Sequence, residues 1–115
     1  ILVDCKLRPL KSIVERGNKT HQIEIPIRNI VKEALDLKAY GLIFVHNHPS
    51  GEVLPSQADI AATELLNQTL LSLDILLLDH IIVSLENYYS MHEHGLLSME
   101  NEYSVLGDTL EKIPL

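Results

Sequence analysis

Tryptophan is absent from this chain of 115 residues, and phenylalanine occurs only once. With 46% hydrophobic residues but few aromatic ones, a core must be built mainly from Leu, Ile and Val. A single cysteine, Cys5, excludes an internal disulfide and favours a reducing compartment, the cytoplasm. Apolar runs are short, and Ile75–Leu78 falls far below the ~20 residues of a membrane-spanning helix. These features predict one globular domain that does not cross a membrane.

Basic residues are also scarce, with 9 Lys and Arg against 16 Asp and Glu, which gives a net charge of −7 and a pI near 5.2. Nucleic-acid-binding domains usually carry a basic surface, so the charge gives no support for direct nucleic-acid binding. The chain begins without Met inside a predicted strand, and we therefore expect residues upstream of it. The basic residues that do cluster lie near the N-terminus: Lys6, Arg8, Lys11, Arg16 and Lys19.

The hydrophobic pattern predicts an α/β domain with a mixed sheet, because strands and helices do not alternate strictly. Pro26 suits a helix start, and Ser56 is a good N-cap for a second amphipathic helix. We expect a domain at residues 1–97 and a C-terminal extension at 98–115. The predicted strands are 1–7, 10–15, 21–25, 42–45, 75–78, 80–83 and 87–91, and the predicted helices are 26–41 and 57–73.

The stretch HNHPSGEVLPSQAD, residues 46–59, concentrates groups that bind metals. His46 follows a predicted buried strand, and His48 points to the same side of an extended chain. Asp59 falls in the first turn of the next predicted helix, where the helix dipole favours a carboxylate. Two imidazoles and one carboxylate form a three-ligand zinc site with a fourth position open for a water, whose pKa the metal lowers towards neutrality.

Each part of this pattern also has a simpler interpretation. A His-x-His pair alone is a weak indicator of metal binding. Ser56 and Asp59 are spaced like the two residues of a capping box, with Asp in place of Glu or Gln. The combination of a buried strand, His-x-His, a turn and an acidic helix start favours the metal site.

The blocks HNHPSG and PSQAD, together with LLDHIIV and the closing HGLL, resemble the RadC family of JAB/MPN (JAMM) metalloprotease-like domains. The resemblance extends from about residue 1 to Leu97. It implies a three-layer α/β/α-type, cytidine-deaminase-like domain around a curved mixed sheet, similar to deubiquitinase-type MPN domains. It also implies a zinc-dependent metallohydrolase, a metalloprotease or isopeptidase, that acts on a peptide or protein substrate.

The resemblance assigns roles to particular residues. It implies that His46, His48 and Asp59 hold Zn²⁺. It implies that Ser56 donates a hydrogen bond to the tetrahedral intermediate as an oxyanion stabiliser. It further implies an upstream glutamate that acts as general base.

The glutamate is where this sequence departs from the family, in which it precedes a Gly-Thr pair on the first strands. Counting back from Gly17 puts Ser12 in that slot, and counting from Asp4 puts the slot near Ile13. Glu15 is the acidic residue on this predicted strand, with the side-chain parity of Ile13. A short deletion would bring Glu15 into place as the base.

Two interpretations of Glu15 therefore stay open, the general base and a solvated turn residue, while Glu24 near the helix start is a poorer candidate. Without a base, the domain would be a catalytically impaired zinc-binding interaction module. A third hypothesis is a DNA-repair-associated factor, after the family's historical label. Exposed edge strands would also be compatible with a homodimer.

Five further residues receive predictions. Asp79 either orients a ligand ring or forms a turn between two strands, with His80 facing partly outward. His92 and His94 are expected on the surface of the closing turn. Cys5 is expected to be a small apolar core residue.

Overall fold

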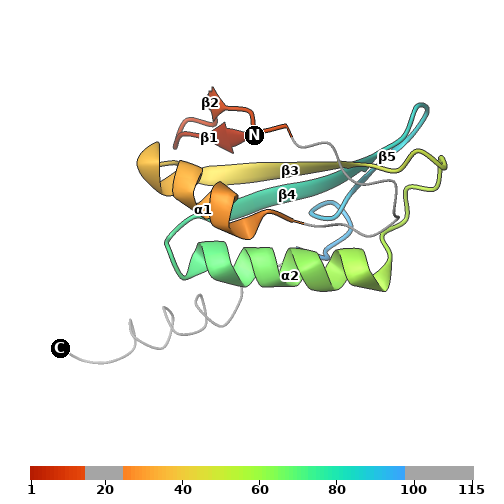
Figure 1. Cartoon of the computed structure of the whole chain (residues 1–115). Coiled ribbons are helices and arrows are strands. Elements are labelled where there is room, and N and C mark those ends of the chain that lie inside the picture. The colour runs from red at the N-terminus through yellow and green to blue at the C-terminus, as the bar shows by residue number, and fades with distance from the viewer. Residues whose placement is uncertain (15–24, 98–115) are drawn as a thin grey trace.

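The computed structural model describes residues 1–14 and 25–97. These residues form a five-stranded sheet of order β2-β1-β3-β4-β5 with two helices (Figure 1). Strands β3 and β4 are parallel, and the other neighbouring pairs are antiparallel. The predicted α/β class with a mixed sheet is confirmed. The elements are β1 (Leu2–Val3), β2 (Pro9–Lys11), α1 (Ile27–Asp36), β3 (Gly41–Asn47), α2 (Gln57–Leu71), β4 (Leu76–Val83) and β5 (Tyr88–Ser90).

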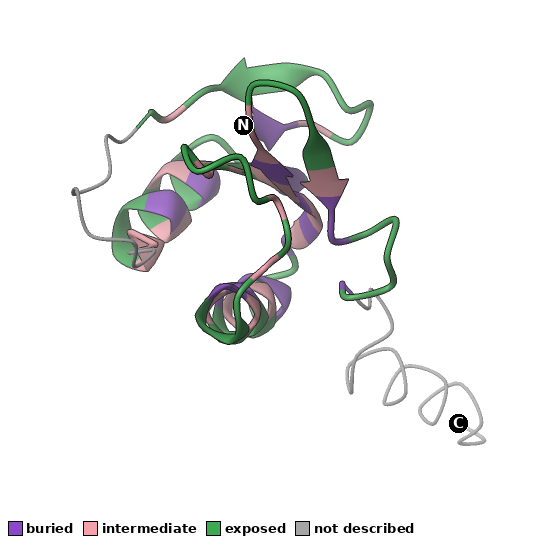
Figure 2. Cartoon of the chain, turned by 90° about the vertical axis from the view of Figure 1, so that its right-hand side faces the viewer, coloured by how far each residue is buried: buried purple, intermediate pink, exposed green. Residues whose placement is uncertain are grey.

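Helix α2 packs along the central strands, beneath β3 and β4 in Figure 1. Its buried residues follow helical spacing and lie on the side nearest the sheet (Figure 2). Two of them, Asp59 and Thr63, are polar, whereas Leu66 and Leu70 are fully buried and apolar. The polar part of the α2 interface is therefore confined to the first turns of the helix.

Strand β4 is continuous, so the prediction of two segments separated by a turn at Asp79 was wrong. The register to β3 pairs Leu42 with Leu77 and then Ile43 with Asp79, which leaves Leu78 as an extra residue. Such a β-bulge shifts the alternation of side chains along a strand. Leu77 and His80, three residues apart, are consequently both buried.

Gly41 faces the start of this bulge. A Cβ atom at Gly41 would lie 3.0 Å from the backbone oxygen of Leu76 and from the side chain of Leu78. The close approach of the two strands at this point therefore favours glycine, because any side chain would crowd the Leu76 backbone.

The first predicted strand is shorter than expected and contains only Leu2 and Val3. The carboxylate of Asp4 accepts hydrogen bonds from the backbone N–H groups of Lys6 and Arg8, at 2.9 Å each, and so ends the strand in a turn. Cys5 lies in that turn and is exposed. The prediction that it packs in the core was wrong.

Two predicted segments cannot be compared with the structure. Most of the strand predicted at 21–25, including His21, lies outside the described residues, as does the extension at 98–115. Within the described ranges, no helix combines the length and apolar character needed to cross a membrane.

Candidate metal centre

The two histidines and Asp59 come together where β3 ends and α2 begins. Strand β3 runs to Asn47, two residues beyond the predicted strand end, so His46 lies on the sheet and His48 directly after it. His48 is tied to the neighbouring parallel strand, because its backbone N–H donates to the carbonyl of Val83 at 2.9 Å. In the described part of the chain, one ligating atom from each of His46, His48 and Asp59 lies within 4.8 Å of the others.

Asp59 is oriented by the N-terminus of α2. Its backbone N–H donates to Ser56 Oγ at 3.0 Å, and its Oδ2 accepts from the Ser56 backbone N–H at 2.9 Å. This is a complete capping box, so the simpler interpretation of the Ser-x-x-Asp pattern holds. It does not compete with the metal interpretation, because the same contacts hold the buried carboxylate against the two histidines.

The ring of His48 is held by a backbone carbonyl. Its Nδ1 lies 2.7 Å from the carbonyl oxygen of Glu52, which can only accept a hydrogen bond, so Nδ1 carries the proton. In the neutral tautomer with this proton, the lone pair is on Nε2, which lies 3.5 Å from Asp59 Oδ2. In metal-binding histidines, the ring nitrogen that does not bind the metal usually donates a hydrogen bond in this way, which fixes the orientation of the ring.

His46 presents the most informative atom of the cluster. Its Nδ1 is buried, has no hydrogen-bond partner and lies 3.9 Å from Asp59 Oδ1. Burial lowers the pKa of His46, His48 lowers it further, and the Asp59 charge opposes both effects. The ring is therefore neutral near pH 7. A metal ion would give this buried nitrogen the partner that the protein does not supply, so the residues fit a divalent metal.

A second buried pair lies directly behind Asp59, and our sequence analysis missed it. Thr63 Oγ1 donates to the Asp59 carbonyl at 2.6 Å and lies 2.6 Å from Nδ1 of His80. His80 has no exposed surface, so the expectation that it faces partly outward was wrong. The pKa of His80 is lowered to about 4, and burial is the largest cause of this shift. A threonine one helical turn after the candidate ligand was the signal in the sequence.

Asp79 points away from this network and does not orient a ligand ring. Its Oδ2 accepts from Ser90 Oγ at 2.5 Å, and its Oδ1 accepts from the His92 backbone N–H at 3.0 Å. Asp79 thus holds β5 and the closing turn. His92 and His94 are exposed on that turn, as predicted.

The structure describes only some of the positions considered for the general base. Ser12 is exposed, and Ile13 packs against the hydrophobic core. Glu15 and Gly17 lie outside the described residues, so the role of Glu15 stays a prediction. Ser56, the other predicted catalytic residue, is at the N-cap of α2, next to the carboxylate of Asp59.

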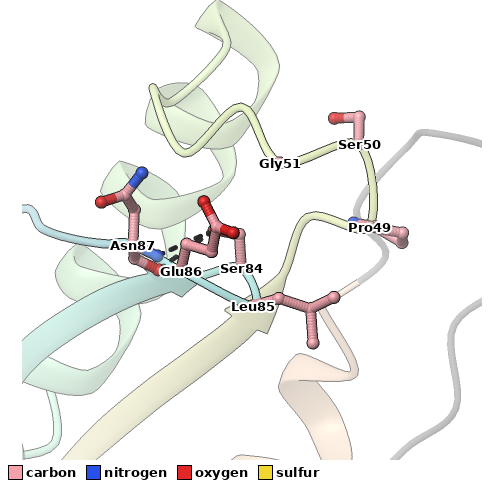
Figure 3. A pocket seen from close by; sticks show the side chains of 7 residues that line it. All are labelled: Pro49, Ser50, Gly51, Ser84, Leu85, Glu86 and Asn87. Carbon is pink, nitrogen blue, oxygen red and sulfur yellow. Dashed lines mark hydrogen bonds between the residues drawn. The ribbon is translucent and has the colours of Figure 1, made fainter.

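A small open pocket lies beside the end of the sheet that carries the candidate metal cluster (Figure 3). One wall is Pro49, Ser50 and Gly51, from the loop that follows His48, and the opposite wall is the β4–β5 turn, 84–87. Its volume is about 210 Å³. The carboxyl ends of the two parallel strands therefore carry the candidate ligands His46 and His48 and a pocket next to them.

A model of the RadC-like JAB domain matches residues 1–96. The chain belongs to the RadC-like JAB domain family. Its RadC-like sequence is 49% identical over 82 residues to a UPF0758 protein of Janthinobacterium sp. (strain Marseille), which covers 71% of this chain. It is 48% identical over 77 residues to the UPF0758 protein YkfG of Escherichia coli (strain K12), which covers 67% of this chain.

The matched part is a fraction of these RadC-family relatives. It covers 36% of the Janthinobacterium protein and 49% of YkfG. A third relative, the UPF0758 protein BAV2405 of Bordetella avium (strain 197N), is 48% identical over 84 residues, which are 37% of its length. The region matched by this chain is therefore less than half of the length of each of these three relatives.

Proposed function

We propose that this RadC-like domain is a zinc-dependent hydrolase that cleaves an amide or isopeptide bond in a peptide or protein. The observation that carries the proposal is the buried, unpartnered Nδ1 of His46, which faces the same carboxylate as Nε2 of His48. Two imidazoles and one carboxylate are the ligand set of a catalytic zinc site with an open position.

In this proposal, each residue of the site has a separate role. His46, His48 and Asp59 hold the metal, and the capping box keeps Asp59 oriented. When bound, zinc would polarise the substrate carbonyl and lower the pKa of a water molecule at the open position. Ser56 Oγ accepts the capping bond from Asp59 N–H, so its own hydroxyl hydrogen can be donated to a developing oxyanion. Glu15 is the proposed general base.

The test is metal binding followed by turnover on a panel of peptides and isopeptide-linked peptides. We expect one zinc per chain, loss of zinc with His46→Ala, and hydrolysis that requires zinc. Ser56→Ala should keep zinc and lower kcat by roughly 10²-fold, the usual effect of one oxyanion donor. Absence of metal binding by the wild-type protein would contradict the proposal.

A second candidate function is a zinc-binding interaction module without catalysis. It is favoured by Ile13, which packs against the core in one of the two positions counted for the base. Glu15→Gln distinguishes the two functions. A hydrolase loses turnover and keeps zinc, whereas a module binds zinc and shows no turnover with either residue.

A further inference from the structure

We propose that His80 and Thr63 are positioning residues, which fix the metal-binding carboxylate of Asp59 through a buried hydrogen-bond chain from β4 to the first turns of α2. This inference rests on the metal site proposed above.

The direction of the hydrogen bonds follows from the atoms available. A hydroxyl has one hydrogen, and Thr63 Oγ1 lies 2.6 Å from the Asp59 carbonyl, which can only accept. The hydrogen therefore points to Asp59. The contact of Thr63 Oγ1 with His80, also 2.6 Å, is then a bond that His80 Nδ1–H donates. The reverse tautomer would leave a buried N–H at Nε2 without an acceptor.

The place of the chain in the fold links it to the ligands. Thr63 is four residues after Asp59, so the two lie one above the other on α2. His80 pairs with Phe44 across the parallel strands, and their rings meet edge to face at 4.8 Å between centroids. His46 follows Phe44 by two residues, and its ring centroid is 6.0 Å from that of His80.

The hydrogen-bond chain therefore gives α2 a second point of contact with the sheet next to the site. Asp59 faces His46, and Thr63, one helical turn further along α2, is hydrogen-bonded to His80. The register of β3 and β4 fixes the distance between His46 and His80. A rotation or slide of α2 that moved Asp59 away from His46 would have to break the buried bond between Thr63 and His80.

An apolar pair would fill this position of the α2 interface without such a constraint. Thr63 and His80 are 2% and 0% exposed, and Nε2 of His80 has no partner. Burying a polar atom without a partner is unfavourable, so a Leu or Phe at this position would suit simple packing better. What the polar pair adds is direction, because hydrogen bonds fix an orientation that apolar contacts leave loose.

The test measures zinc affinity of the full chain by competition with a chromophoric chelator, together with thermal unfolding of the metal-free protein. Thr63→Val keeps the volume of the side chain and removes the hydroxyl. We expect it to weaken zinc binding by about 10- to 100-fold, the usual effect of losing a group that orients a ligand. Thr63→Ser restores the hydroxyl and should bind zinc within about threefold of wild type.

Thr69→Val is the matched control on the same helix. Thr69 Oγ1 donates to the carbonyl four residues before it, Leu65, at 2.8 Å, in the way that Thr63 Oγ1 donates to Asp59. Thr69 is only partly buried, however, and within the described residues its hydroxyl forms no hydrogen bond with a histidine. Its zinc affinity should be that of wild type. His80→Asn places an amide N–H near the position of Nδ1 and should retain most of the affinity that His80→Leu loses.

The outcomes separate this inference from the proposal on which it rests. Wild-type zinc binding with no change in Thr63→Val overturns the positioning role and leaves the metal site intact. A Thr63→Val protein that melts earlier but binds zinc with wild-type affinity below its melting temperature assigns the pair a purely structural role and also overturns the inference. Absence of zinc binding by the wild type overturns both. If His80→Leu does not fold, the Thr63 pair of variants decides.

Discussion

Asp79 and His80 are neighbours on β4, yet their side chains join different parts of the molecule. Asp79 accepts hydrogen bonds from Ser90 and from the backbone of His92, and so fastens the closing turn. His80 donates to Thr63 and so fastens the start of α2, where the candidate metal ligand lies. Polar residues in one apolar strand can therefore have separate roles, which depend on the elements that pack against each face of the strand.

The two networks should differ most strongly in their influence on zinc affinity. Asp59→Ala removes a ligand and the capping box, and it should weaken zinc binding by more than about 100-fold. Asp79→Ala should leave zinc affinity unchanged, because its partners Ser90 and His92 contact no candidate ligand. Calorimetric titration of both variants checks the pair. Equal loss of affinity in the two would show that β4 acts as one network.

The second prediction concerns pH and the metal-free protein. His80 has a pKa of about 4 when folded, against 6.5 for an ordinary histidine, so the unfolded chain binds more protons between these values. The stability that comes from neutral His80 is present above pH 6.5 and is lost as pH falls towards about 4. The expected loss is roughly 3 kcal/mol, read from urea unfolding across this range.

Carboxylates also titrate in this range, so the difference between wild type and His80→Asn carries that prediction. We expect the difference in unfolding free energy between the two proteins to change with pH by the amount that His80 contributes. A difference that stays constant from pH 7 to pH 4 would contradict a buried neutral His80.

The third prediction gives Asp79 its own measurable effect. Asp79→Ala leaves the hydroxyl of Ser90, which is 2% exposed, without its acceptor. We expect a loss of about 1–3 kcal/mol in the free energy of unfolding, the usual result of leaving a buried hydrogen-bond donor without an acceptor. Chemical denaturation measures it. Unchanged stability would mean that the closing turn is held by its apolar residues alone.

The smallest predicted effect concerns the helix cap. Ser56→Ala removes the acceptor for Asp59 N–H and should lower stability by about 1 kcal/mol. Ser72→Ala is the control at the other end of α2, where the exposed Ser72 hydroxyl donates to the Thr69 carbonyl, and it should stay within about 0.5 kcal/mol of wild type. Thermal melting of both variants checks the difference, and equal losses would contradict a special role of the cap.

Much of the α/β framework was predictable, because its signals are local. Ser56 marked the start of α2, and the apolar run before His46 marked β3. The bulge at Leu78 was not predictable, since it depends on how β4 pairs with β3 and on the close approach at Gly41. Because the sequence does not reveal the bulge, the alternation of buried and exposed side chains along β4 could not be predicted. The burial of His80 was missed for that reason.

The candidate site divides in the same way. The spacing of His46, His48 and Asp59 indicated a metal cluster, because strand parity and a helix start are local features. The partners that orient these ligands come from elsewhere in the fold, as with the bond from His80 to Thr63, or from the path of a loop, as with the Glu52 carbonyl at His48. Periodicity and spacing give no information on such contacts.

The most direct test of the account is X-ray absorption spectroscopy of the zinc-loaded protein, compared with His46→Ala. We expect one zinc per chain, with two imidazole nitrogens and at least one oxygen at about 2.0–2.2 Å, and loss of the imidazole signal in the variant. A wild-type protein without stoichiometric zinc, or a zinc whose ligands are unchanged by His46→Ala, would contradict it.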